Sequence, residues 1–456
     1  MRQVRKKSAD PAARPYLLKA RQEGLELSWN RFESMLPQDG FGKLGLTCFE
    51  CLQGPCRLNP FSQNEELTIC GRSKEDLVGQ NLLRILNQSS DAQEVFVADN
   101  PGSTLTEKLL KTAQMQIEEK KKNRESLSKE KISKQVGLGV LREDKVNICL
   151  EGITSSVLKA CAALAEEMTE EAVNRGAKGY NLVLAGDVTP HYPVPTVSNA
   201  GGVEFAILSG IVDLYAVGKT GLGLGKNVVS AYHTVYRDAP SQPEKEEIKD
   251  WFVQAAVAYG KRNKAKVLLS DQNGQADLLQ LNRTLIKAHL DQGSIRKICV
   301  LTGGSSVAVQ EDALLCEAAV KLAAEDVLCL AIGNAAATLG KYGLLASGAK
   351  EASANVTRAL GTDQGAPVYW AGSETEILEV LDLIEGVGAE RVLAIAPELS
   401  TSGDLQTALA LAGAGVKVFT AVQLPVYGCE KVARDLDELI SSCAPTDFVE
   451  RIIAEL

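Results

Sequence analysis

The chain has 456 residues, of which 45% are hydrophobic, and its formal net charge at neutral pH is −9. This length favours about three domains, and the mild negative charge offers no basic face for nucleic acid. No apolar run reaches the roughly 18 residues that a membrane-spanning helix needs, and no apolar signal core follows the basic N-terminus. Eleven cysteines in such a chain favour a metal site in a reducing compartment over a disulfide framework. We therefore expect a cytoplasmic protein without nucleic-acid or membrane partners.

The first 140 residues are predicted to form a small helical domain. Apolar residues recur at helical spacing within residues 10–38, and residues 73–87 offer Ser73 as a helix N-cap with Asp76 in the first turn. Residues 104–135 are also helical in pattern but carry runs of lysine and glutamate. Such runs are more typical of a solvated helix face than of a binding tail.

A loop between these predicted helices, residues 48–71, carries the four cysteines Cys48, Cys51, Cys56 and Cys70. Their spacing, C-x2-C-x4-C-x13-C, is not the paired spacing of a zinc ribbon, and no histidine lies nearby to complete a zinc finger. Thiolates are the usual ligands of iron–sulfur clusters, and glycines beside the cysteines let the backbone approach such a centre. The pattern therefore favours a [4Fe–4S] cluster, with structural zinc and disulfides or free thiols as the alternatives.

From Lys145 onward, short apolar strand patterns alternate with helical ones. The first cycle predicts strands at residues 146–152, 181–187, 212–218 and 266–271, and a helix at 154–176. The second cycle predicts strands at 295–304, 326–333, 367–372, 391–398 and 417–422, and helices at 308–324, 335–345, 374–386 and 403–413, before a helical tail. Such alternation is typical of a parallel sheet covered by helices on both faces. The predicted fold is therefore α/β, with a helical domain at residues 1–140 and two Rossmann-like, doubly wound domains at 141–294 and 295–456.

Ligands of such sheets bind beyond the carboxyl ends of the strands. The predicted exits carry Glu151, Asp187, Gly218-Lys219-Thr220, Gly303-Gly304-Ser305, Gly333-Asn334, Gly372-Ser373-Glu374 and Gly428-Cys429. Residues 218–227 read GKTGLGLGKN, but Thr220 and Asn227 break the phosphate-loop pattern. The chain has only three histidines, His191, His233 and His289, which is too few to favour a histidine-based metal site or a Ser-His-Asp triad. Most cysteines outside the loop lie inside strand or helix patterns, where cysteine usually acts as a small buried hydrophobe, whereas Cys429 is placed for a second site.

The cysteine loop resembles that of the anaerobic, nickel-containing carbon monoxide dehydrogenases, which are relatives of the hybrid-cluster proteins. The resemblance rests on the segments SADPAARPYLLKARQEGLELSWNRFESMLPQ, CFECLQGPCRLNPF, ICG, LVGQNLLRIL, VNICLEG, GAKGYNLVLAG, EFAILSGIVDLYAVG, AAATLGKYGLL, PVYWAGS and VQLPVYGCEKV. It implies a helical domain followed by two Rossmann-like domains, and a homodimer. It also implies that Cys48, Cys51, Cys56 and Cys70 hold an electron-relaying [4Fe–4S] cluster.

The sequence departs from this family at the other metal centres. Asp39 and Thr47 stand where the family usually has two cysteines that share a cluster across the dimer axis. The segments that correspond to the family's nickel–iron–sulfur site read EGITSS, LAGDVT, GKTGLG, IGNAAA and GSETEI, without cysteine or histidine. The family's histidine-rich helix is also missing, because residues 81–99 contain no histidine. Since a nickel–iron–sulfur cluster needs soft ligands, nickel is not expected.

These observations predict an iron–sulfur protein that passes single electrons to or from a partner, such as a ferredoxin or a larger dehydrogenase. A first alternative is an oxidoreductase with a remodelled metal site between the Rossmann-like domains, with Cys429, Glu374, Lys219 and His233 as pocket candidates. A second alternative is a non-catalytic assembly or maturation partner of a full-length dehydrogenase.

Overall fold

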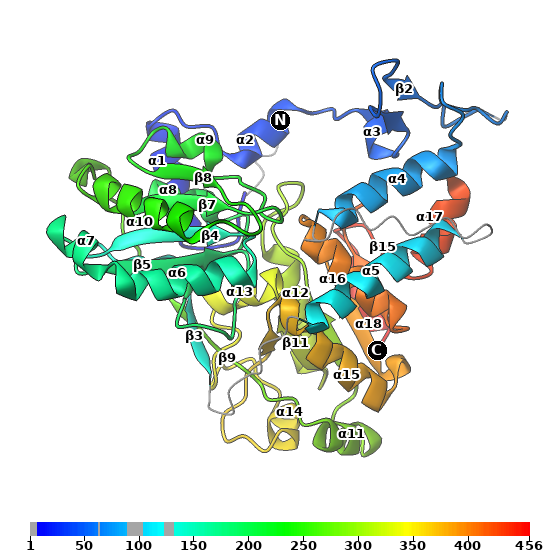
Figure 1. Cartoon of the computed structure of the whole chain (residues 1–456). Coiled ribbons are helices and arrows are strands. Elements are labelled where there is room, and N and C mark those ends of the chain that lie inside the picture. Colours follow the sequence, from blue (N-terminus) through cyan, green and yellow to red (C-terminus); the bar gives the residue numbers. More distant parts are fainter. Residues whose placement is uncertain (1–6, 63, 89–103, 123–131) are drawn as a thin grey trace.

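The computed structural model describes residues 7–62, 64–88, 104–122 and 132–456. Within these residues the protein is an α/β fold built around two open sheets that lie side by side (Figure 1). None of its described helices is long and apolar enough to cross a lipid bilayer.

The first sheet has seven strands in the order β8-β7-β4-β5-β6-β3-β9. Its strands are β3 (Ser133–Val136), β4 (Val146–Glu151), β5 (Tyr180–Ala185), β6 (Thr196–Ser198), β7 (Val212–Val217), β8 (Val235–Asp238) and β9 (Gly274–Asp277). All neighbouring strands are parallel except β3 and β9, which are antiparallel. Every residue of β4 is buried, as expected for a central parallel strand that is covered on both faces.

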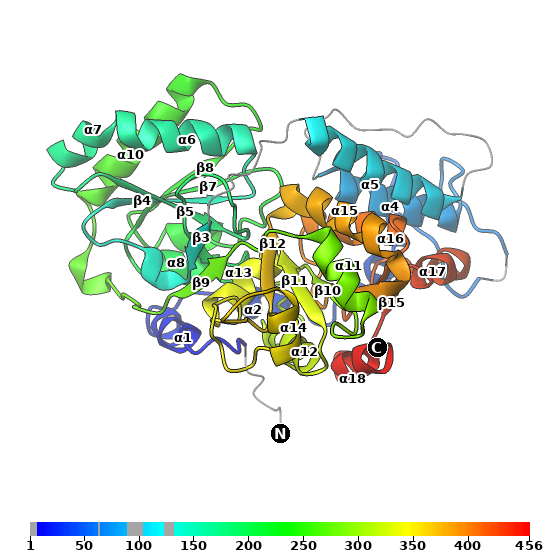
Figure 2. The same cartoon turned by 90° about the horizontal axis from the view of Figure 1, so that it is seen from below.

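Helices cover both faces of the first sheet (Figure 2). One face packs against α6 (Ser155–Glu167), α7 (Thr169–Asn174) and α10 (Lys245–Tyr259), and the other against α1 (Ala13–Gln22), α2 (Ser28–Ser34), α8 (Val203–Leu208) and α9 (Lys226–Val229). Trp251 of α10 fills the first interface, and Trp29 of α2 stacks on Phe205 of α8 in the second, with ring centroids 5.6 Å apart.

The second sheet has six parallel strands in the order β12-β11-β10-β13-β14-β15. Its strands are β10 (Ile298–Leu301), β11 (Leu328–Ile332), β12 (Tyr369–Gly372), β13 (Val392–Ile395), β14 (Lys417–Thr420) and β15 (Ile440–Ser442). One face packs against α12 (Ala313–Ala324), α13 (Asn334–Lys341) and α18 (Phe448–Ala454). The core on the other face includes α11 (Arg283–Asp291), α14 (Ala354–Ala359), α15 (Ile377–Val387), α16 (Ser402–Gly413) and α17 (Glu430–Asp437).

The helices of the first 140 residues are shared between the two sheets. α1 packs against α8 on the first sheet, whereas α4 (Lys74–Asn87) and α5 (Leu105–Lys122) pack against α16 on the second. Gln406 of α16 donates a hydrogen bond to Gln116 of α5 at 2.9 Å. The short α3 (Gly40–Lys43), β1 (Thr47–Cys48) and β2 (Cys56–Arg57) lie beyond α4 (Figure 1).

Two backbone contacts join parts of the chain that are distant in sequence. At the edge between the sheets, Leu278 bridges to Trp370 of β12, and the Leu279 amide donates to the Trp370 carbonyl at 2.8 Å. Near the N-terminus, Ser8 bridges to Glu311 ahead of α12. The segment that leads into α1 is thereby fixed to the second half of the chain.

Most predicted elements are confirmed, and four are wrong. The tail predicted as helical after residue 422 also contains the strand β15. Residues 266–271 form no strand, because this segment runs beside the end of α8, where the Leu268 amide donates to the Ser209 carbonyl at 2.8 Å. Residues 133–136 form a strand rather than the end of a helix, with alternate residues buried. The helix predicted from 308 begins only at Ala313, after Asp312 adopts a positive φ of 68°.

Other boundaries also differ from the prediction. The helix predicted over residues 10–38 is divided into α1 and α2, with Gly24 between them at a φ of 66°. Ser73 caps α4 as predicted, since its side chain accepts from the Asp76 amide. The part of the predicted charged helix at 123–131 lies outside the described residues, and the domain limits at 140 and 294 stay predictions.

Candidate functional site

The cysteine loop begins as a short hairpin in which β1 pairs antiparallel with β2, so that Cys48 lies opposite Cys56. Gly54 turns the chain between them, and its amide donates to the Cys51 carbonyl at 3.2 Å. A Cβ at this position would lie 3.2–3.4 Å from backbone atoms of Cys48, Cys51 and Cys56. The absence of a side chain at Gly54 therefore lets the backbone of three cysteines gather around one turn.

Cys70 joins the hairpin from a second turn, residues 68–72. Gly71 has a positive φ of 86°, and its amide donates to the Thr68 carbonyl at 2.9 Å. The Thr68 hydroxyl lies 3.4 Å from the Cys70 sulfur. This hydrogen bond, helped by the positive charge of Arg72, lowers the pKa of the Cys70 thiol. A lowered thiol pKa favours the thiolate, which is the form that binds metal.

The loop is anchored on the second half of the chain. Leu46 and Leu58, which flank the hairpin, are both buried. The Asn81 amide group of α4 donates to the Gly45 carbonyl at 3.0 Å, and the Gly428 amide donates to the Leu44 carbonyl at 3.0 Å. Helix α4 and the turn before α17 thus hold the strand that carries Cys48.

The donor chemistry of the loop fits an iron–sulfur cluster. All eleven cysteines are free thiols; in the loop Cys48 is buried, Cys56 is half-buried, and Cys51 and Cys70 are exposed. Among the described residues, no three histidine, cysteine, aspartate or glutamate side chains are grouped to hold one metal ion. A [4Fe–4S] cluster makes a different demand, because each of its four thiolates binds a different iron atom. The loop has the required type and number of ligands, because it carries four free thiols with backbone amides nearby.

Asp39 and Thr47 stand at the two positions where a cluster-bridging cysteine was expected to be missing, and each has a different local environment. The Asp39 carboxylate accepts from the Gly42 amide at 2.8 Å and caps α3. Thr47 is buried beside Cys48, and its hydroxyl has no hydrogen-bond partner.

The structure does not bring the four pocket candidates together. Cys429 is the residue before α17 and lies beside the cysteine loop, because Gly428 packs against Leu46. Lys219 is exposed beyond β7. The His233 Nε2 lies 3.0 Å from the carboxylate of Asp213. Asp213 is near the amino end of β7, so His233 lies away from the strand exits.

The fourth pocket candidate, Glu374, lies in a cluster of carboxylates between the two sheets. The Glu374 amide is 3.4 Å from the Asp187 carboxylate at the exit of β5. A Cβ on Gly403 would lie 2.2 Å from a Glu374 carboxylate oxygen, which brings Glu374 close to the first turn of α16. Burial and the Glu374 charge raise the pKa of Asp187 well above its usual value, and raise that of Asp404 to about 7. Asp404 was not predicted, because its sequence context reads as an ordinary helix start.

A second buried polar cluster lies around the start of α12. The Lys341 ammonium is 2.6 Å from the Asp312 carboxylate and 3.4 Å from that of Asp10. Burial and the Asp312 charge raise the pKa of Glu311 to about 8. Both carboxyl oxygens of Glu311, and one of Glu398, are buried without a hydrogen-bond partner. No motif in the sequence marked these residues, since they come from four separate parts of the chain: the N-terminal segment, the loop before α12, the end of α13 and the segment after β13.

Exposed apolar side chains gather in and around the cysteine loop. We call them the apolar rim: Met35, Leu36, Phe49, Leu52, Phe61, Leu67 and Ile69, with exposed fractions from 48% to 105%. Isolated exposed apolar residues are normal, and these seven are concentrated in one segment of the sequence.

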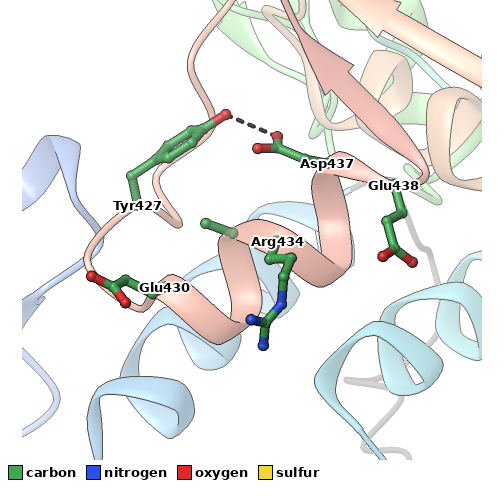
Figure 3. Close-up of a pocket in the computed structure, with 6 residues that line it drawn as sticks. Tyr427, Glu430, Arg434, Asp437 and Glu438 are labelled. Carbon is green, nitrogen blue, oxygen red and sulfur yellow. Dashed lines mark hydrogen bonds between the residues drawn. The ribbon is translucent and has the colours of Figure 1, made fainter.

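A shallow open groove lies next to this region, along α17. It is lined by Tyr427, Glu430, Ala433, Arg434, Asp437 and Glu438 (Figure 3). The Tyr427 hydroxyl donates to the Asp437 carboxylate at 2.9 Å across the groove. Charged side chains that are open to solvent supply little of the apolar enclosure typical of a small-molecule site.

Comparison with known proteins gives relatives of one kind. Carbon monoxide dehydrogenase 1 of Carboxydothermus hydrogenoformans is 24% identical over an alignment of 515 positions, which covers 79% of this chain and 80% of that protein. Carbon monoxide dehydrogenase 1 of Methanosarcina mazei is 43% identical over 93 residues, which are 20% of this chain and only 15% of that protein. No family model matches the chain.

The fold agrees with these relatives. The structure of carbon monoxide dehydrogenase IV from Carboxydothermus hydrogenoformans superposes with a TM-score of 0.77 at 20% identity, covering 99% of both chains. At that identity the likeness concerns the fold. Together with the sequence similarity along most of the chain, it shows that this protein and the carbon monoxide dehydrogenases are homologues with a common fold.

Proposed function

We propose that this protein carries a single [4Fe–4S] cluster on Cys48, Cys51, Cys56 and Cys70 and serves in electron transfer. The observation that carries the proposal is the loop itself, in which four free thiols lie on one anchored hairpin and its following turn. Bound there, such a cluster accepts and donates one electron at a time.

The chain's own residues would perform two tasks at this centre. Leu46, Leu58 and the hydrogen bond from Asn81 keep the hairpin fixed on α4. A fixed protein environment reduces the reorganisation that accompanies each electron transfer. Cys51 and Cys70 lie on the exposed side of the loop, where a redox partner such as a ferredoxin or a larger dehydrogenase can approach.

A nickel-containing centre is not expected, because the residues at the strand exits are of the wrong kind. The strand exits offer Glu151, Asp187, Asn334 and Glu374, whereas a nickel–iron–sulfur cluster needs soft thiolate and imidazole ligands. Glu151 is also already engaged, since its carboxylate accepts from the Tyr215 hydroxyl and, at 2.7 Å, from the Leu222 amide.

The apolar rim supports a homodimer as the working form. Residues such as Phe49, Leu52 and Phe61 border the thiols and are largely exposed in the single chain. A second copy that covers these apolar side chains would remove apolar area from water.

The proposal is tested by anaerobic metal analysis together with electron paramagnetic resonance of the dithionite-reduced protein. We expect about four irons per chain, no nickel and one cubane signal. Fewer than about three irons would contradict a [4Fe–4S] cluster on four thiolates. Nickel, or several additional irons, would contradict the single-cluster assignment.

A second candidate function, an oxidoreductase with a metal between the two sheets, has less support. Glu374 lies beside Asp187, its charge acts on Asp404, and carboxylates suit harder metals than thiolates do. Among the described residues, however, no three such side chains are grouped to hold one metal ion. If this candidate is correct, substituting Asp404 with asparagine removes a metal other than the cluster iron, and metal analysis of that variant separates the two candidates.

A further inference from the structure

Arg72 lies at the junction between the two halves of the cysteine loop. It ends the 68–72 turn that carries Cys70, yet its guanidinium Nη1 is 3.9 Å from the Cys48 sulfur in the hairpin. Its charge also acts on the Cys70 thiol. One cation therefore contacts the Cys48 thiol and acts electrostatically on the Cys70 thiol, 22 positions later in the sequence.

The guanidinium is held in this place by contacts on both sides. The Arg72 amide donates to the Thr68 hydroxyl at 2.9 Å, and its carbonyl accepts from the Thr68 amide at 2.9 Å. At the other end, the guanidinium donates to the side-chain carbonyl of Gln80 on α4. Arg72 is half-buried, so its charge is less screened than that of a fully solvated arginine.

We propose that Arg72 is a positioning residue that raises the reduction potential of the cluster; this rests on the proposed function. A one-electron reduction adds negative charge to a centre that four thiolates already make negative. A guanidinium within hydrogen-bond reach of a ligand sulfur stabilises the reduced state more than the oxidised one, because the attraction grows with the charge. Arginine suits this task, since its fork of N–H groups can face more than one acceptor and stays charged at every physiological pH.

The matched control is Arg57, which directly follows a cluster cysteine but is directed elsewhere. Its guanidinium lies over the Phe41 ring, 5.4 Å from the ring centroid. Substituting Arg57 with glutamine removes the same charge from the same loop without removing a contact to sulfur. Any shift shared by both variants then measures the general effect of net charge.

The experiment is an anaerobic, dye-mediated redox titration of the full chain, followed by electron paramagnetic resonance of the reduced cluster. In Arg72→Gln we expect the reduced-to-oxidised ratio at a fixed solution potential to fall about tenfold, a shift of about 59 mV to more negative potential for a one-electron couple. In Arg72→Lys, which keeps the charge but not the fork, the shift should be in the same direction and less than half as large. In Arg57→Gln it should be at most a small fraction of the Arg72→Gln shift.

Iron content, measured first, separates this inference from the proposed function. A wild-type protein without a cluster would refute the proposed function. A wild-type cluster whose potential is unchanged in Arg72→Gln, or changes equally in Arg57→Gln, would refute only the role of Arg72.

A second variant covers the case in which Arg72→Gln fails to retain iron. Gln80→Ala leaves the charge in place and releases the guanidinium from α4. It should retain iron and shift the potential in the same direction by a smaller amount. An unchanged potential in Gln80→Ala, together with cluster loss in Arg72→Gln, would assign Arg72 a structural role and overturn the inference.

Discussion

Substituting Gly45 with alanine should weaken the attachment of the cysteine loop to the second half of the chain. Gly45 has a positive φ of 77°, and a Cβ there would lie only 2.1 Å from the Pro425 carbonyl oxygen. Positive φ costs a non-glycine residue about 1–2 kcal/mol. The contact with Pro425 adds to this, because both partners are backbone and neither can turn away. We expect a total cost of about 3 kcal/mol, in the upper range of single substitutions.

Gly24 provides the matched control for this prediction. It also has a positive φ, 66°, but a Cβ at that position would have no heavy atom within 4 Å. Gly24→Ala therefore carries the conformational cost of about 1–2 kcal/mol without the clash. The difference between the two variants isolates the contact between the loop and the turn before α17.

Amide hydrogen exchange measures the loss of stability in Gly45→Ala at the contacts that anchor the cysteine loop. The Gly428 amide donates to the Leu44 carbonyl, and the Leu58 amide donates to the Leu46 carbonyl at 3.2 Å. If these bonds are lost by local opening, a cost of about 3 kcal/mol makes both amides exchange about a hundredfold faster in Gly45→Ala, because each 1.4 kcal/mol is a factor of ten. Gly24→Ala should leave both amides unchanged. Equal protection in the two variants would refute the claim that this contact anchors the loop.

Three further outcomes follow from the site. Burial and the Asp312 charge raise the pKa of Glu311 from 4.5 to about 8. Between these two pH values the folded state keeps a proton that the unfolded chain has lost, so the free energy of unfolding falls by a few kcal/mol as the pH rises from about 4.5 to about 8. In Glu311→Gln the urea midpoint should fall less steeply with pH than in the wild type, and an unchanged slope would contradict the assignment. Cys51→Ser should lower the iron content while Cys429→Ser keeps about four irons, and iron loss in Cys429→Ser would mean that this thiol takes part in the centre. Leu52→Glu places a charge in the apolar rim and should shift sedimentation toward a smaller species. The control Val253→Glu, at an exposed residue of α10, should not change sedimentation. If both variants sediment like the wild type, the rim is not the dimer contact.

The sequence predicts the parts of this protein whose determinants are local. Ser73 and Asp76 cap α4 as their spacing indicated, and the buried strands β4 and β10 follow from short apolar runs. The strand pattern at 266–271 misled because an apolar run cannot tell a sheet from another buried surface, and here α8 supplies that surface.

The buried carboxylates between the two sheets and at the start of α12 were less predictable, because their burial depends on tertiary contacts. Asp187 and Glu374 could be named because parallel strands end at a common edge. Asp404 and Glu311 could not, because one lies in a helix start and the other in a loop that tertiary contacts turn inward. Their raised pKa values arise from neighbours far away in the sequence, and no local pattern encodes such proximity.

This contrast also gives a physical reason why the two centres can change independently. The cysteine loop contains its whole donor set within 23 residues, so it needs only a surface to rest on, which α4 and the turn before α17 supply. A centre at the strand exits would need ligands from the ends of β5, β11 and β12 and from α16 at the same time. A substitution at those exits leaves the hairpin contacts untouched, because none of those contacts involves an exit residue. A chain of this kind can therefore keep its cysteine loop while the strand exits carry buried acids, which suit protons or harder cations.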